Sequence, residues 1–227
     1  MKILNVLKYH VKMNKQIILF IMAVFFSCFC LAGQDAGYFT YGMDTSKSPA
    51  PLGLKAGDKA PDFSGYDQQG SRVQSKKILE SGPIVLFFYL GKWSSDCSKY
   101  LNNYQDSLDI LTGMGVNLVA VTPESIENVE QTVNLHNLKF TVIYDCQEQI
   151  MKDYDVMFDV ARAYQDSVLQ HISVDIAKNN GRDVAHLPVP ATYIINRDGT
   201  IVAVYFNQDF HERASVKWMI KNIARAI

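Results

Sequence analysis

The stretch PIVLFFYLGKWSSDCSKYL, residues 83–101, joins a run of apolar residues to a cysteine at the start of a predicted helix. A continuous apolar run of this length is typical of a strand that is covered on both faces of a sheet. After Ser94 the apolar residues recur at intervals of three and four, which predicts a helix that ends at the GMG of residues 113–115. Cys97 therefore lies in the first turn of a helix, where unpaired N–H groups and the helix dipole favour a thiolate.

Strands and helices alternate outward from this stretch. Residues 57–74 contain short extended pieces that are broken by Pro61 and Gly70, as in a hairpin. The downstream pattern predicts strands at 116–122 and 140–145, helices at 125–137 and 147–154, two strands within 191–206 around an RDG turn, and a last helix at 212–227. This order predicts an α/β fold, in which a mixed sheet with an antiparallel edge carries helices on both faces.

The N-terminus has the layout of a signal peptide. A basic start is followed by the apolar run QIILFIMAVFF at 16–26 and by small residues that end at Gly33. The run is shorter than a membrane span of about 20 residues, so we expect residues 1–33 to be cleaved and the protein to be exported to the periplasm or cell envelope. The residues before Cys28 do not form a lipobox, so a lipid anchor is the less favoured reading. Residues 34–55 have many turn formers and predict a linker or loose arm before one domain at 56–227.

Charge and cysteine content restrict the partners of the predicted mature chain. Residues 1–33 contain four lysines and no acidic residue, so 18 basic residues would remain against 23 acidic ones. An acidic chain of this kind is not expected to bind nucleic acid. Only Cys97 and Cys146 remain after cleavage, too few for a fold built on disulfides.

Three blocks in this order resemble the alkyl hydroperoxide reductase and thiol-specific antioxidant family of peroxiredoxins. They are GDKAPDF at 57–63, PIVLFFYLGKWSSDC at 83–97 and LPVPATYIINRDGTI at 187–201. The resemblance implies a thioredoxin-like fold of the peroxiredoxin type over residues 57–213. It also implies a peroxide-attacking cysteine preceded by Ser or Thr three residues earlier, which matches Ser94 and Cys97.

The sequence departs from the family pattern near this cysteine. The first cysteine of the related W-C-P-x-C pattern is replaced by Ser94, which disfavours a disulfide reductase. The proline expected seven residues before Cys97 is Leu90, and the arginine that faces the thiolate in the family aligns with Pro190. By resemblance, we expect Pro190 to be the cis-proline of thioredoxin folds and the thiolate to lack its arginine.

The residues around Cys97 allow functional and structural readings. Ser94 can cap the helix through the N–H of Cys97, or donate to a peroxide or to the thiolate. Trp93 is expected to form a wall of the active-site loop. Lys92 would favour the thiolate, whereas the adjacent Asp96 would oppose it. If Cys97 is not a nucleophile, it is a buried thiol packed beneath Trp93.

Cys146 and the histidines are secondary candidates. Cys146 follows a predicted parallel strand, and the family's strand order places it two strands, or about 10 Å, from the strand that leads to Cys97. This exceeds the limit of about 7 Å between the Cα atoms of two cysteines in a disulfide. A role of Cys146 as resolving cysteine would therefore require local unwinding of a helix end. His186 is a possible proton relay near Pro190 or a plain loop residue. His136, His171 and His211 show no metal-ligand spacing, and no metal or other cofactor is predicted.

These observations lead to a hypothesis of an exported thiol peroxidase. Cys97 would attack hydrogen peroxide or an alkyl hydroperoxide, and the resulting sulfenic acid would be reduced by an external thiol, such as a thioredoxin-like protein or a small thiol, or by Cys146. The alternatives are a non-catalytic thioredoxin-fold binding module and a degenerate thiol-disulfide oxidoreductase. The sequence does not predict the oligomeric state.

Overall fold

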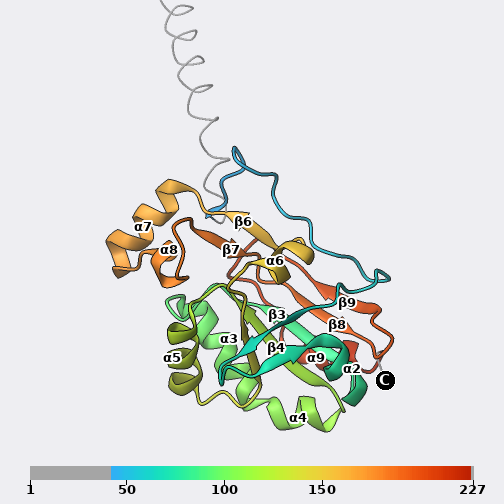
Figure 1. Ribbon diagram of the computed structural model, residues 1–227. Helices are drawn as coiled ribbons and strands as arrows, with labels where there is room; N and C mark the ends of the chain where they lie inside the picture. The colour runs from blue at the N-terminus through green and yellow to red at the C-terminus, as the bar shows by residue number, and fades with distance from the viewer. Residues whose placement is uncertain (1–41, 226–227) are drawn as a thin grey trace, which may run out of the picture. The chain divides into compact units, whose positions relative to one another are not determined.

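The computed structural model describes residues 42–225, which fold around a mixed seven-stranded sheet (Figure 1). The strands are β1 Ser64–Asp67, β2 Arg72–Gln74, β3 Ile84–Phe88, β4 Asn117–Thr122, β5 Thr141–Tyr144, β6 Met157–Asp159, β7 His186–Pro188, β8 Thr192–Ile195 and β9 Ile201–Tyr205. The helices are α2 Ser75–Ser81, α3 Ser95–Asp106, α4 Leu108–Gly113, α5 Ile126–His136, α6 Gln149–Asp153, α7 Arg162–Ile172, α8 Ile176–Asn179 and α9 Val216–Ile223. The predicted α/β class is confirmed.

The large sheet has the strand order β2-β1-β5-β4-β3-β8-β9. Strands β3, β4 and β5 are parallel, whereas β8 and β9 run antiparallel and form one edge. All five residues of β3 are buried, as its continuous apolar run predicts for a central strand. The carboxyl ends of β3, β4 and β5 therefore meet at one edge of the sheet, and in open α/β sheets such an edge is where sites gather.

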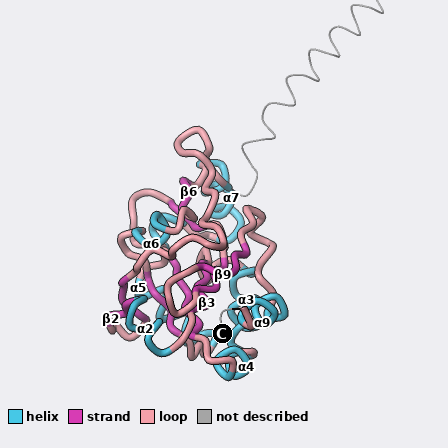
Figure 2. The backbone as a smooth tube through the Cα atoms, turned by 90° about the vertical axis from the view of Figure 1, so that its right-hand side faces the viewer, coloured by secondary structure: helices cyan, strands magenta, loops and turns pink. Residues whose placement is uncertain are grey.

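The side chains of β3 point alternately to the two faces of the sheet and pack into two separate apolar cores. Val85 and Phe87, together with Tyr89 just after the strand, pack with side chains of α3, α4, α5, α8 and α9, and this core contains Cys97. Ile84, Leu86 and Phe88 pack with side chains of α2 and α6. Figure 2 shows α2 on one side of the sheet and α3 and α9 on the other, so the predicted helical layers on both faces are confirmed.

Several element boundaries differ from those predicted. The single helix expected after Ser94 is divided at Ser107 into α3 and α4, because Ser107 leaves helical geometry with φ −103° and ψ 6°. The last helix begins only after Ser215, which accepts a hydrogen bond from the N–H of Trp218 as its N-cap. The segment β6-α7-α8-β7 was not predicted, although α7 carries apolar residues four positions apart at Tyr164, Val168 and Ile172.

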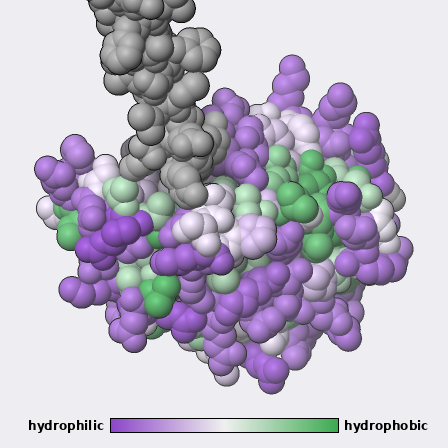
Figure 3. Space-filling view, turned by 90° about the horizontal axis from the view of Figure 1, so that it is seen from above, coloured by the Kyte–Doolittle hydropathy of each residue, from purple (hydrophilic) through white to green (hydrophobic). Residues whose placement is uncertain are grey.

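The predicted signal peptide lies outside the described residues, as does the first part of the predicted linker. From residue 42 the chain contacts the domain: Met43 is buried and pairs with Val160 as an isolated bridge, and the N–H of Gly53 donates to Asp155 O over 3.0 Å. No helix within residues 42–225 is long and apolar enough to cross a membrane. The surface in Figure 3 is mainly hydrophilic, with apolar residues in a few groups.

Candidate active site

Cys97 is positioned by the turn that connects β3 to α3. Gly91 has φ +150°, and a Cβ at this position would lie 2.6 Å from Trp93 Nε1, so only glycine fits without a shift of the indole. Ser94 then adopts extended geometry, and its Oγ accepts from the N–H of Cys97 over 3.3 Å. The predicted N-cap is confirmed, and Cys97 lies in the first turn of α3.

The Cys97 side chain is 1% exposed. A small cavity beside it is lined by residues of β3, α3, β8 and the segment before α9, among them Tyr89, Tyr104 and Arg213. The cavity offers only about 10 Å³ to the centre of a water-sized sphere, which is close to the minimum for one water molecule. A peroxide can therefore reach the sulfur only when neighbouring side chains move.

Arg213 faces the sulfur from the segment that precedes α9. Its Nη2 lies 3.7 Å from Cys97 Sγ, and the residue is 7% exposed. Within residues 42–225 this guanidinium pairs with no carboxylate, and its Nη1 donates to the carbonyls of Phe210 and Glu212. A buried cation without a carboxylate partner favours a negative charge on the atom that it faces. The expectation that the thiolate lacks an arginine was therefore wrong, because another segment supplies one.

Several contacts hold the segment of Arg213 against α3. Tyr104 Oη donates to Ala214 O over 2.6 Å, and the Arg213 guanidinium lies 5.6 Å from the centre of the Tyr100 ring. At the start of the same segment, His211 Nδ1 lies 2.6 Å from Asp96 Oδ2. Helix α3 therefore carries both the sulfur and the groups that anchor the guanidinium.

The charges expected to act on Cys97 have other partners. The Asp96 carboxylate pairs with His211, and the Lys92 ammonium donates to Gln131 Oε1. The Lys92 N–H donates to Glu124 Oε1 over 3.0 Å. In this structure Arg213, not Lys92, is the cation in contact with the sulfur.

Pro190 is not a cis-proline, because residues 42–225 contain no cis peptide bond. Ala191 N–H donates to Val189 O over 2.7 Å, which closes a tight turn across Pro190. Val189 N–H donates to Val156 O over 2.7 Å and fixes the entrance to this turn. An inverse γ-turn of this type suits the fixed φ of a trans proline. The prediction of a cis-proline at this position, which rested on the family resemblance, was therefore wrong.

Trp93 packs against the core that contains Cys97, and within residues 42–225 its buried indole Nε1 has no hydrogen-bond partner. The buried hydroxyl of Tyr89 has none in the same range, and Tyr89 is one of the residues that line the cavity. Glu124 follows β4 and is fully buried, and burial raises the pKa of its carboxyl. The sequence analysis did not single out Tyr89 or Glu124. The only signal for Glu124 was an acidic residue two positions after a buried parallel strand.

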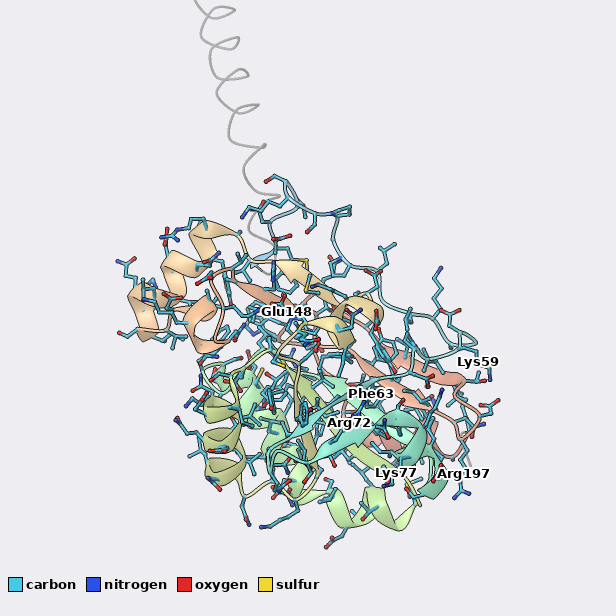
Figure 4. All side chains as sticks on the ribbon, viewed as in Figure 1. Lys59, Phe63, Arg72, Lys77, Glu148 and Arg197 are labelled. Carbon is cyan, nitrogen blue, oxygen red and sulfur yellow. The ribbon has the colours of Figure 1, made fainter. Side chains whose placement is uncertain are left out.

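Cys146 and His186 lie in a different environment from Cys97. Cys146 is exposed and follows β5, which is separated from β3 by β4, and both cysteines are free thiols. His186 Nδ1 lies 3.0 Å from Glu148 Oε1, and Arg182 Nη2 lies 2.9 Å from Glu148 Oε2. Figure 4 shows Glu148 at the start of α6. His186 is thus part of an ion-pair network, and within residues 42–225 it forms no hydrogen bond or ion pair with Cys97.

The network shifts the pKa values of Glu148 and His186. Burial raises the pKa of Glu148, but hydrogen bonds from His186 and Arg182 outweigh this effect and lower it to about 2. The same hydrogen bond with Glu148 raises the pKa of His186. Within residues 42–225, no group of three or more His, Cys, Asp or Glu side chains has the arrangement of a metal site.

Arg213 was missed because sequence reasoning placed the arginine only at the family position of Pro190. A contact between residues 97 and 213 has no local signal, since the two positions are joined only by the packing of the last segment on α3. The sequence also predicted a helix from residue 212, whereas α9 begins at Val216. Arg213 was therefore assigned to a helix and was not considered as a loop residue of the active site.

Comparison with known proteins agrees with this architecture. The AhpC/TSA family matches residues 56–204. Peroxiredoxin Q from Sedum lineare is 24% identical over 152 residues, which cover 67% of this chain and 69% of the relative. Peroxiredoxin Bcp from Escherichia coli is 24% identical over 145 residues, which cover 58% of this chain and 92% of the relative. The crystal structure of a peroxiredoxin-like protein from Aquifex aeolicus has a TM-score of 0.61 at 16% identity and covers 78% of this chain and 91% of its own.

The family match spans both the strand that leads to Cys97 and the antiparallel β8–β9 edge. The chain therefore belongs to the AhpC/TSA family, as a peroxiredoxin-like protein of the thioredoxin superfamily.

Proposed function

We propose that this protein is a thiol peroxidase in which Cys97 is the only peroxide-attacking cysteine. Family membership supports the reaction class, and the contact of 3.7 Å between Arg213 Nη2 and Cys97 Sγ carries the assignment to this residue. Cys97 also lies in the first turn of α3, at the positive end of the helix dipole, while its own N–H donates to Ser94 Oγ. The guanidinium and the helix start both favour the thiolate, which is the nucleophilic form.

The proposed reaction requires no cofactor. The Cys97 thiolate attacks one oxygen of hydrogen peroxide or a small alkyl hydroperoxide, the O–O bond breaks, and the departing oxygen takes up a proton. Cys97 becomes a sulfenic acid. An external thiol then attacks the sulfenic sulfur, releases water, and yields the free Cys97 thiol after exchange with a second thiol.

Chemical labelling tests the assignment. The protein is treated with limiting hydrogen peroxide and a sulfenic-acid probe, and labelled cysteines are mapped by peptide mass spectrometry. We expect label at Cys97 in the wild type and in Cys146→Ser, and none in the corresponding peptide of Cys97→Ser. Label at Cys146 alone, or at neither residue, would contradict the proposal.

A second candidate function is favoured by the burial of Cys97 at 1% exposure. A thioredoxin-fold module with an inert thiol would bind partner peptides near the turn at Pro190 and would need no access to the sulfur. Failure of Cys97 to label, with slow alkylation of the folded protein, would favour this function.

Export is part of the proposal and rests on the N-terminal sequence pattern. Cell fractionation followed by N-terminal sequencing should recover a chain outside the cytoplasm that begins near Gln34. A full-length product in the cytosol would contradict export and leave the assignment of Cys97 unaffected.

A further inference from the structure

A groove lies at the amino ends of β4 and β5. It has a volume of about 450 Å³, is open to solvent, and is lined in part by residues of β2, α2 and α4. Cavities of about 300–1,000 Å³ are typical of sites that hold small molecules. Cys97 follows the opposite, carboxyl end of the parallel strands, and no residue lines both the groove and the cavity beside the sulfur. The groove is therefore separate from the candidate active site.

Three cations line the groove without a partner. They are Arg72 on β2, Lys77 on α2 and Lys139 just before β5, and Figure 4 shows the first two on their neighbouring elements. Within residues 42–225, none of the three side chains forms an ion pair or a hydrogen bond, whereas Lys76 beside them pairs with Asp62 over 2.8 Å. No acidic side chain lines the groove. Positive charge thus gathers here in a chain with a formal net charge of −1.

The base of the groove is apolar. Val116, Leu118 and Phe140 line it and belong to the core on one face of the sheet. Val73 and Ile78 line it as well, are half-buried, and pack against the core on the other face. Apolar surface that is open to water is stabilised when the apolar part of a ligand covers it. The groove therefore offers an apolar base beside a cluster of cations.

Hydrogen bonds fix the walls of the groove. Asn117 Nδ2 at the start of β4 donates to Ser81 Oγ over 3.1 Å and to Gly82 O over 3.3 Å, which joins β4 to the end of α2. The N–H of Lys139 donates to Gln105 Oε1 over 2.7 Å, which holds the start of β5 against α3. The groove is thus formed without a ligand, as small-molecule sites usually are.

We infer that this groove binds a small organic anion with an apolar chain, of the class of medium-chain carboxylates. The carboxylate would lie among the three cations, and the chain would cover the apolar base. An inorganic anion would use only the cations, and a neutral lipid would use only the base, whereas an amphipathic anion matches both. The inference goes beyond the proposed peroxidase and does not depend on the reactivity of Cys97.

The test compares three ligands that separate charge from apolar surface. Octanoate carries both, 1-octanol carries only the chain, and acetate carries only the charge. Isothermal titration calorimetry of the protein with each ligand should show octanoate binding at least about tenfold more tightly than either of the others. Potassium chloride should weaken the binding of octanoate, because salt screens exposed charges.

Variants of the two lysines locate the site, since Arg72 also lines a second hollow beside Cys146. Lys77→Gln and Lys139→Gln should each weaken the binding of octanoate about three- to fivefold, the range for an exposed ion pair, and the double variant about tenfold. Lys76→Gln is the matched control, because this lysine lies on the same helix, pairs with Asp62 and does not line the groove. Its affinity for octanoate should stay within about twofold of that of the wild type.

Nuclear magnetic resonance gives a second readout that needs no variant. Titration with octanoate should shift the methyl signals of Val73 and Ile78, which line the groove. No binding of octanoate, binding of 1-octanol as tightly as octanoate, or equal affinities in the wild type and the double lysine variant would overturn the inference. Binding of octanoate that leaves both methyl groups unshifted would also overturn it, because the ligand would then occupy another surface.

Discussion

Arg213 shows how one residue changes the chemistry expected of Cys97. A thiol stabilised only by a helix terminus gains about 0.3–1 kcal/mol when exposed and up to about 2 kcal/mol when partly buried. A hydrogen bond from a charged donor adds about 1.5–3 kcal/mol. The guanidinium is therefore at least as important as the helix start, and both act on the same atom.

Replacing Arg213 by Gln should slow the reaction of Cys97 with hydrogen peroxide roughly 10- to 100-fold, because the charged donor to the sulfur is lost. Iodoacetamide alkylation at pH 7 should also slow, since the cation that faces the sulfur is removed. Arg197→Gln is the matched control, because this exposed arginine donates to Ser81 O at a distant edge of the sheet. Equal rates in wild type and Arg213→Gln would show that the contact with sulfur is not functional.

At the scale of elements, the site is assembled by three segments. The turn between β3 and α3 presents the sulfur, the segment before α9 presents the guanidinium, and the loop after β4 presents Glu124. The Asp96–His211 pair joins the first two segments. Asp96 was expected to oppose the thiolate, but its partner gives it a role in holding the segment of Arg213.

His211→Ala should slow oxidation of Cys97 by at most about fivefold. The pair is partly exposed, with side-chain exposures of 62% for His211 and 30% for Asp96, and such pairs contribute about 0–1 kcal/mol. The same rate assay applies, with His171→Ala on α7 as the control. Faster oxidation in His211→Ala would show that the segment does not position Arg213 and that the pair restrains the site.

Gly91→Ala should destabilise the fold by about 1–3 kcal/mol, because alanine would adopt a positive φ and its methyl group would meet the indole of Trp93. Urea unfolding measures this loss. Gly70→Ala is the control, since it also has a positive φ but no atom within 4 Å of its added methyl group. Equal losses in both variants would mean that backbone strain alone acts at Gly91.

At the scale of the whole molecule, the Glu148–His186–Arg182 network joins α6 to the segment β6-α7-α8-β7. The pKa of Glu148 falls from 4.5 to about 2, so its contribution to stability is present above pH 4.5 and is lost as the pH falls towards 2. The pKa of His186 rises above 6.5, so its contribution is present below pH 6.5 and is lost as the pH rises through the folded value.

Thermal unfolding at a series of pH values tests this network. The wild type should lose stability both below pH 4.5 and above pH 6.5, and Glu148→Gln should flatten both limbs while it lowers the midpoint at neutral pH. Glu130→Gln, on the exposed face of α5, is the control. A Glu148→Gln profile parallel to that of wild type would show that the network does not control stability.

The sequence by itself determined the strand before Cys97, the cap from Ser94 and the alternation that makes the fold α/β, because each depends on residues close together in the chain. The position of Arg213, the trans geometry at Pro190, the pairing of Asp96 with His211 and the burial of Glu124 depended on tertiary structure. These features arise where segments about 30 to 120 residues apart pack on each other, and loop closure over such distances leaves no periodic signal in the chain. The local pattern thus specified the nucleophile, and the packing of distant segments supplied the charges that act on it.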